Sequence, residues 1–170
     1  MIRTLILSSA ALMLSACGFK PLHATSHTGV NLSDVEVVLA NVQDVQDREA
    51  GYYMQQRLLD RVGTQDSAKH VVTIIPSVRR RSIGTTVNDV ASRYDITLQA
   101  KYELTERQSG KVLDNGVVTA VSTFGAPDDA FGLIAADTNG TQQGAKELAD
   151  RLLLKLSTYY SQEKALKAAP

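Results

Sequence analysis

The sequence contains very little cysteine, histidine or aromatic side chain. One Cys and three His occur among 170 residues. This excludes an internal disulfide and any Cys-clustered zinc or iron–sulfur site, and it leaves little material for a His-rich metal centre. With no Trp, three Phe and six Tyr, a protein that binds single-stranded nucleic acid by aromatic stacking is disfavoured.

Neither sign of charge predominates. Lys and Arg together number 18, as do Asp and Glu, so no overall charge attracts the chain to nucleic acid, and we predict no nucleic-acid partner. Eleven Gly and four Pro exclude collagen-like and low-complexity chains. A hydrophobic content of 44% in 170 residues is enough for the core of about one globular domain.

Motifs of enzyme chemistry are also missing. The sequence has no glycine-rich phosphate loop, no G-x-S-x-G and no H-E-x-x-H. Residues 161–164 match S-x-x-K without its companion motifs, the pair Asp128 and Asp129 suits a loop or a helix cap, and His23 and His27 suit a solvated linker. No set of nucleophile, base and orienting group can be assembled. We predict a protein that is not an enzyme and has no metal or cofactor.

A single long apolar run lies at the N-terminus. Residues 5–14 follow Arg3 and are too few to span a bilayer, which needs roughly 20 apolar residues. The run ends in Leu-Ser-Ala before Cys17, a pattern similar to the lipobox of bacterial lipoproteins. It predicts a signal peptide over 1–16 and a diacylglycerol and N-acyl chain on Cys17. Two or more acyl chains anchor stably. The resemblance to lipoproteins sorted in Gram-negative envelopes implies that Gly18 is permissive for export to the outer membrane.

The remaining chain shows periodic segments of both helix and strand type. Apolar residues from Tyr94 to Leu104 alternate with polar ones, which indicates a half-buried strand with one polar face. Pro76 is expected to stop central strand pairing. The expected elements are strands over 35–39, 69–75, 94–104 and 112–124, helices over 46–62 and from 137 or 138 to about 161, a turn over 107–111 and a loop over 125–136.

This order of elements predicts an α+β fold. We expect a two-layer α/β sandwich, with a mostly antiparallel sheet of about four strands and two helices packed on one face. The expected organisation is a lipidated tether over 17–33, a single domain over 34–162 and a flexible tail over 163–170. No second domain is expected.

Three successive arginines form a local concentration of charge. Guanidinium groups bind phosphate bidentately, so Arg79, Arg80 and Arg81 are a candidate anion-binding cluster. Lys101 and Lys111, which flank the predicted hairpin, extend this cluster if the fold brings them together. The alternative is a solvated loop, or an edge strand that its charges protect from aggregation. The residues alone leave both open.

Taken together, these segments resemble the family of LPS-assembly lipoproteins, LptE, in its alphaproteobacterial form. The similarity lies in residues 14–22 (LSACGFKPL), in 93–98 with 102–104, in 110–113 and in the closing stretch 144–152. It spans nearly the whole chain. Residues 122–126 depart from the pattern, because a more aromatic segment is expected there.

The resemblance implies an outer-membrane lipoprotein that faces the periplasm and is held in the inner leaflet by its lipid. Such a protein plugs the LptD-type β-barrel that transports lipopolysaccharide, supports its assembly and helps deliver lipopolysaccharide to the outer leaflet. Arg79–Arg81, with Lys101 or Lys111, are then candidates for contact with lipopolysaccharide phosphates. The alternative is a lipid-anchored interaction module of another envelope secretion or efflux assembly.

Overall fold

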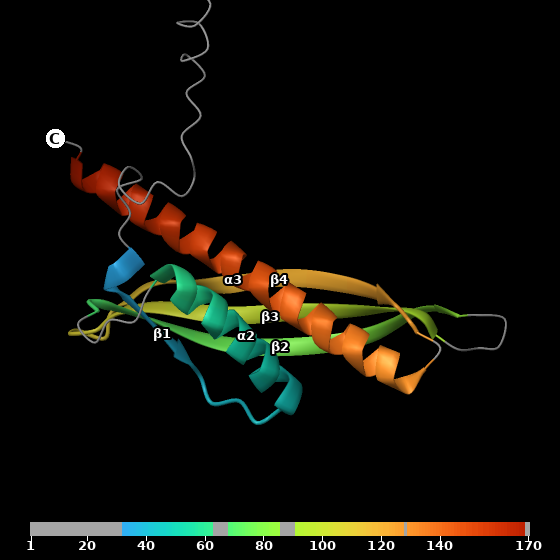
Figure 1. Cartoon of the computed structure of the whole chain (residues 1–170). Helices are drawn as coiled ribbons and strands as arrows, with labels where there is room; N and C mark the ends of the chain where they lie inside the picture. Colours follow the sequence, from blue (N-terminus) through green and yellow to red (C-terminus); the bar gives the residue numbers. More distant parts are fainter. Residues whose placement is uncertain (1–31, 63–67, 86–90, 128, 169–170) are drawn as a thin grey trace, which may run out of the picture.

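The computed structural model describes residues 32–62, 68–85, 91–127 and 129–168. Both α-helices cover the same face of a four-stranded sheet (Figure 1). No element of the described residues covers the opposite face. The predicted α+β sandwich is confirmed. In chain order the elements are η1 (Leu32–Asp34), β1 (Val35–Leu39), α2 (Val45–Val62), β2 (His70–Thr85), β3 (Ala91–Glu106), β4 (Val112–Gly125) and α3 (Ala130–Ala168).

The sheet has the strand order β1-β2-β3-β4. β1 is parallel to β2, whereas β2–β3 and β3–β4 are antiparallel. The short β1 pairs only with the first five residues of β2, from Val35 opposite His70 to Leu39 opposite Ile74. Beyond Ile74, therefore, β2 is itself an edge strand.

β2 continues through Pro76, beyond the strand end that was expected at residue 75. The Ile74 carbonyl accepts a hydrogen bond from Ala40 N (2.9 Å), and Val78 N donates to Asp47 Oδ1 (2.7 Å). The backbone groups of both β2 residues thus point away from β3. Pro76 lies between them in the same orientation, so its missing N–H faces the edge that β1 has left. It breaks no bond of the β2–β3 ladder, so the expected strand end at residue 75 was wrong for this geometric reason. Central pairing does end near Pro76, as expected, because β2 is an edge strand beyond Ile74.

The alternating pattern of β3 places its even-numbered residues against the helices, as predicted. The buried core includes Met54 and Leu58 of α2, Leu148, Leu152 and Leu156 of α3, and Ile96, Leu98, Ala100 and Leu104 of β3.

Helix α2 has nearly the predicted bounds, and Gly51 sits where it meets the sheet. A Cβ at Gly51 would lie 2.8 Å from Leu39 Cδ1 and 3.0 Å from Pro76 Cγ. The absence of a side chain therefore lets the helix pack closely on β1 and β2. On its other side, Arg57 forms a two-point ion pair with Asp150 of α3, with Nε–Oδ1 and Nη2–Oδ2 distances of 3.1 Å each. This exposed pair links the two helices at the surface.

Helix α3 begins at Ala130, well before the expected start at residue 137 or 138. Asp129 caps it: the Asp129 carboxylate accepts a hydrogen bond from Gly132 N (2.7 Å), and its carbonyl accepts one from Leu133 N (3.1 Å). A cap of this kind satisfies backbone donors that the first turn leaves free. Most of the loop expected over 125–136 is therefore helix.

The same helix continues to Ala168, where a flexible tail was expected from residue 163. On this stretch Glu163 and Lys167 lie one helical turn apart, and Lys167 Nζ forms an ion pair with Glu163 Oε1 (2.6 Å). Ser161, the serine of the S-x-x-K match, donates its hydroxyl to the Ser157 carbonyl (2.7 Å). Its partner is thus helix backbone rather than a base.

The hairpin between β3 and β4 closes at the predicted turn, where Gly110 has a φ of 67°. Leu104 faces Asp114 and Thr105 faces Val112, so Leu113 is an extra, bulged residue in β4. Gly116 lies within β4 opposite Tyr102.

Candidate binding surface on the open face of the sheet

The uncovered face of the sheet is formed by odd-numbered residues of β2, β3 and β4. Partners across a ladder project to the same face, and Ile75, Lys101 and Val117 form one row across the three strands. The even-numbered neighbours Ile74 and Tyr102 are buried under the helices. We call the uncovered side the open face.

The three successive arginines do not form one cluster. Arg79 and Arg81 lie on the open face, opposite Thr97 and Asp95 of β3. Arg80 projects to the covered face, where its guanidinium forms an ion pair with Asp137 of α3. Because successive residues of a strand alternate in direction, a run of three in β2 divides two to one between the faces.

The two candidate lysines also separate. Lys101 lies on the open face, four residues along β3 from Thr97, which is about 13 Å at 3.3 Å per residue. Lys111 is in the turn, where its carbonyl accepts a hydrogen bond from Glu106 N (2.9 Å). Glu106 is nine residues beyond Thr97 along β3, so Lys111 lies roughly 30 Å from Arg79. The fold therefore brings Lys101, and not Lys111, towards the arginines.

A further arginine, Arg93, joins the open face and was missing from the candidates. It lies opposite Ile83 of β2 and Gly125 of β4. Its odd position in the alternating series of β3 was the signal that could have identified it. We define the basic row as the cations Arg79, Arg81, Arg93 and Lys101.

Asp95 is the acidic residue that the ladder places among the basic row, and it accepts a hydrogen bond from Thr123 Oγ1 (2.6 Å). Glu103 lies two residues along β3 from Lys101 and lines the same surface depression, whereas Glu36 lies further toward the other end of the strands. Although the whole chain is neutral, this part of the open face has an excess of positive charge.

The open face is more apolar than the polar strand face that the sequence suggested. Ile75, Val117 and Val121 expose 46%, 53% and 52% of their surface. Ile75 and Val117 also line a shallow depression of about 420 Å³, together with Lys101. We call these three residues the apolar stripe. Next to the basic row, they form a surface suited to a ligand that combines anionic groups with hydrocarbon.

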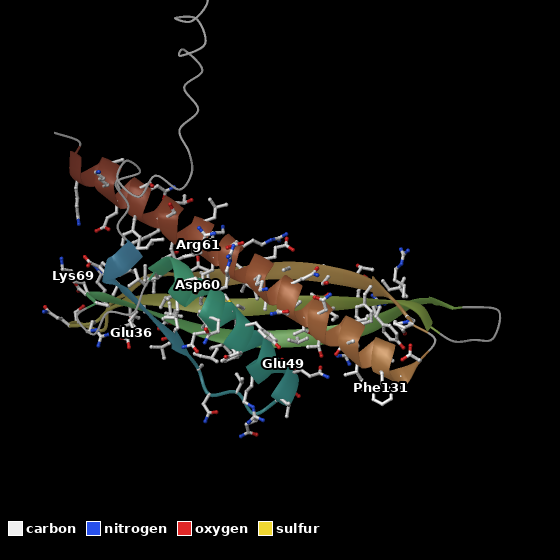
Figure 2. The ribbon with its side chains drawn as sticks, in the orientation of Figure 1. Glu36, Glu49, Asp60, Arg61, Lys69 and Phe131 are labelled. Carbon is white, nitrogen blue, oxygen red and sulfur yellow. The ribbon has the colours of Figure 1, made fainter. Side chains whose placement is uncertain are left out.

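Apolar side chains are also exposed at the start of α3. Phe131 and Ile134 expose 85% and 64% of their surface. Figure 2 shows Phe131 pointing away from α3 at the end of the molecule remote from Lys69 and Glu36. The sequence did not reveal this feature, because these residues were expected to be loop.

On the covered face, Tyr102 and Asp114 form a polar pair. Tyr102 donates its hydroxyl to Asp114 Oδ2 (3.0 Å). Burial, and then the hydrogen bond with Asp114, raise the pKa of Tyr102 to about 12. A Cβ at Gly116 would lie 3.1 Å from the Tyr102 ring, so the absence of a side chain there makes room for the ring.

Several predicted residues lie outside the described part of the chain, namely Cys17, His23, His27 and Asp128. Within residues 32–62, 68–85, 91–127 and 129–168, no three His, Cys, Asp or Glu side chains gather where they could hold a metal ion. Over the same ranges, no helix is both long and apolar enough to cross a membrane.

No family model and no curated protein matches this sequence. Solved structures do match its fold. A candidate lipoprotein of Caulobacter crescentus has a TM-score of 0.62 at 23% identity, over 78% of this chain and 94% of that one. Rare lipoprotein B of Shewanella oneidensis has a TM-score of 0.57 at 15% identity, over 76% and 98% of the two chains. A minor lipoprotein of Acinetobacter baumannii has a TM-score of 0.52 at 13% identity, over 73% and 90%.

The chain has the fold of these lipoproteins. Because this chain covers nearly the full length of each, the likeness extends to the whole domain rather than to a shared sheet or helix pair. At such identities the likeness concerns the fold, and it assigns no ligand or partner.

Proposed function

We propose that this chain is an outer-membrane lipoprotein, anchored through lipid on Cys17, that plugs the LPS-transporting β-barrel. In this role it supports assembly of the barrel and helps deliver lipopolysaccharide to the outer leaflet. It faces the periplasm, its lipid lies in the inner leaflet of the outer membrane, and it needs no catalytic residue.

The observation that supports the proposal most strongly is the shared fold with rare lipoprotein B and other lipoproteins. Independently of the fold, the N-terminal sequence ends its apolar run at Cys17 in a lipobox pattern. A shared fold alone says little about function. The two features together favour a lipid-anchored protein of this structural group, and the resemblance of its sequence to the LptE family favours the role in lipopolysaccharide assembly.

The open face supplies a surface whose chemistry suits lipopolysaccharide. The lipid part of lipopolysaccharide has acyl chains and phosphates. The acyl chains match the apolar stripe, and the phosphates match the basic row. Arginine binds phosphate through paired hydrogen bonds, and Arg79 and Arg81 lie on the same face. We therefore keep Arg79, Arg81 and Lys101 as candidate contacts and add Arg93. Arg80 and Lys111 are left out, because one is paired with Asp137 and the other lies in the distant turn.

The deciding experiment is purification of the full-length, C-terminally tagged chain from native membranes in mild detergent. Copurifying proteins are identified by mass spectrometry, and lipopolysaccharide is assayed in the same fractions. We expect a stoichiometric large β-barrel together with lipopolysaccharide. A Cys17→Ala variant is the matched control, since it removes the lipid and should leave the membrane fraction.

Recovery of other envelope proteins without a large barrel would contradict the proposal. So would normal lipopolysaccharide at the cell surface after depletion of the protein. Either result would favour the alternative, a lipid-anchored interaction module of another envelope assembly.

A further inference from the structure

The two free edges of the sheet differ in how they are protected. The part of β2 beyond β1 contains Pro76 and Arg79–Arg81, and Asp47 binds its Val78 N–H. These are features by which proteins prevent an edge strand from pairing with another chain. The other edge, β4, has no Pro and no charged residue over 115–125, and six of the eleven residues there are Val, Thr or Ser. This bare edge is the starting point of the inference.

The backbone direction of β4 follows from two hydrogen bonds. Glu106 N donates to Lys111 O, so even-numbered residues of β3 direct their backbone groups towards β4. Thr119 lies opposite the odd-numbered Gln99, and its own groups therefore point outwards. In agreement, the Thr119 carbonyl accepts a hydrogen bond from Arg151 of α3 rather than from β3. Val117 and Val121 share this outward direction.

A hollow of about 500 Å³ lies beside this edge, between β4 and α3. Its β4 side includes Val117 and Thr119, and its α3 side includes Arg151, Leu154 and Lys155. Leu154 exposes 69% of its surface. The hollow thus adjoins the free backbone groups and combines apolar side chains with two cations.

We propose that the β4 edge binds an extended segment of a partner protein in which acidic and apolar residues alternate, and that this segment adds a fifth strand to the sheet. Residues that face Val117 and Val121 would be apolar. Their neighbours would project towards α3, where Arg151 and Lys155 would meet acidic side chains. An incoming N–H would take the Thr119 carbonyl from Arg151 and leave Nη1 of that guanidinium available to the segment, while Nη2 stays paired with Glu147. Strand addition of this kind is a recurrent mode of peptide recognition.

Charge disfavours a second copy of this chain at the same edge. Antiparallel pairing of β4 with its own copy about a two-fold axis would bring the two α3 helices side by side on the same face. Arg151 and Lys155 of one copy would then face the same cations of the other. A closed barrel has no free strand edge to offer, so the site is also distinct from a contact with a barrel wall.

The test uses the full-length lipidated chain in detergent and an acetylated, amidated octapeptide of alternating Val and Glu. A peptide with Lys in place of Glu is the matched probe. Hydrogen exchange should slow at the outward amides of Val117, Thr119 and Val121 when the Val-Glu peptide is added. Thr119→Pro removes an outward donor without breaking the β3–β4 ladder, and we expect it to weaken binding about tenfold.

Lys155→Glu is a second variant that leaves the backbone intact, and it should weaken binding several-fold. Lys146→Glu, an equal charge change at another exposed position of α3, should have no effect. Three results would overturn the proposal: no added protection at millimolar peptide, equal binding of the Lys peptide, or protection without peptide that grows with protein concentration. The last would assign the edge to a second copy.

Discussion

Arg80 of β2 and Asp137 of α3 form an ion pair on the covered face of the sheet. Their side chains are only 33% and 26% exposed, and the Oδ1 atom of Asp137 is buried without a hydrogen-bond partner among the described residues. The negative charge of the Asp137 carboxylate is therefore balanced by the Arg80 guanidinium. This contact joins the first third of α3 to β2, although the two residues are 57 positions apart in the sequence.

We expect Arg80→Ala to lower the free energy of unfolding by about 1–3 kcal/mol, because it leaves a shielded carboxylate without its partner. Arg79→Ala and Arg81→Ala, which remove side chains of the open face, should change it by less than about 0.5 kcal/mol. Urea denaturation of the three variants measures the difference. Equal effects at all three positions would show that the ion pair contributes nothing specific.

The division of the arginines shows how far strand prediction from the sequence extends. The alternation of β3 was plain, and its buried and exposed residues follow it from Ile96 to Leu104. For β2, Pro76 suggested an end to pairing, so the arginines after it were given no strand direction. Whether a proline breaks a ladder depends on which side its nitrogen faces and on whether a strand is paired there. The register with β3 decides the first, and the length of β1 decides the second. A single sequence does not contain this information.

The start of α3 was missed for a related reason. Its first seven residues, Ala-Phe-Gly-Leu-Ile-Ala-Ala, contain a glycine and no acidic residue in the first turn, so the usual signs of a helix start are weak. The sign that was present is Asp129, which had been noted as a possible cap. The later part of the helix was correctly predicted, because apolar residues from Ala145 to Leu156 recur there at helical spacing and are buried.

Gly116 offers a test of packing within β4. In Gly116→Ala the new Cβ would lie 3.1 Å from the Tyr102 ring and hydroxyl, so the ring must shift and its hydrogen bond to Asp114 weakens. We expect a loss of about 1–3 kcal/mol. Gly125→Ala is the matched control, because a Cβ there meets nothing within 4 Å. Thermal unfolding compares the two, and equal melting temperatures would contradict the packing argument.

The Tyr102 hydroxyl should affect stability at high pH. Its pKa rises from 10.0 to about 12 in the folded chain, through burial and through Asp114. Above pH 10 the unfolded chain loses this proton more readily than the folded one. The contribution of Tyr102 is therefore complete below pH 10 and declines as the pH rises towards 12. Denaturant titrations at pH 9 to 12 should show a steeper decline for the native sequence than for Tyr102→Phe.

The proposed role of the basic row predicts that Arg79→Ala/Arg81→Ala weakens binding of purified lipopolysaccharide to the full-length chain by about tenfold. It should also reduce the salt dependence of binding, since salt screens exposed charges. Lys111→Ala is the control: it removes a cation from the turn, roughly 30 Å away, and should leave the affinity unchanged. Lysine at both positions keeps the charge but loses the paired hydrogen bonds of guanidinium, so Arg79→Lys/Arg81→Lys should restore the salt dependence more fully than the affinity. If the double alanine variant and Lys111→Ala bind equally well, the phosphates of lipopolysaccharide do not meet the open face at these arginines.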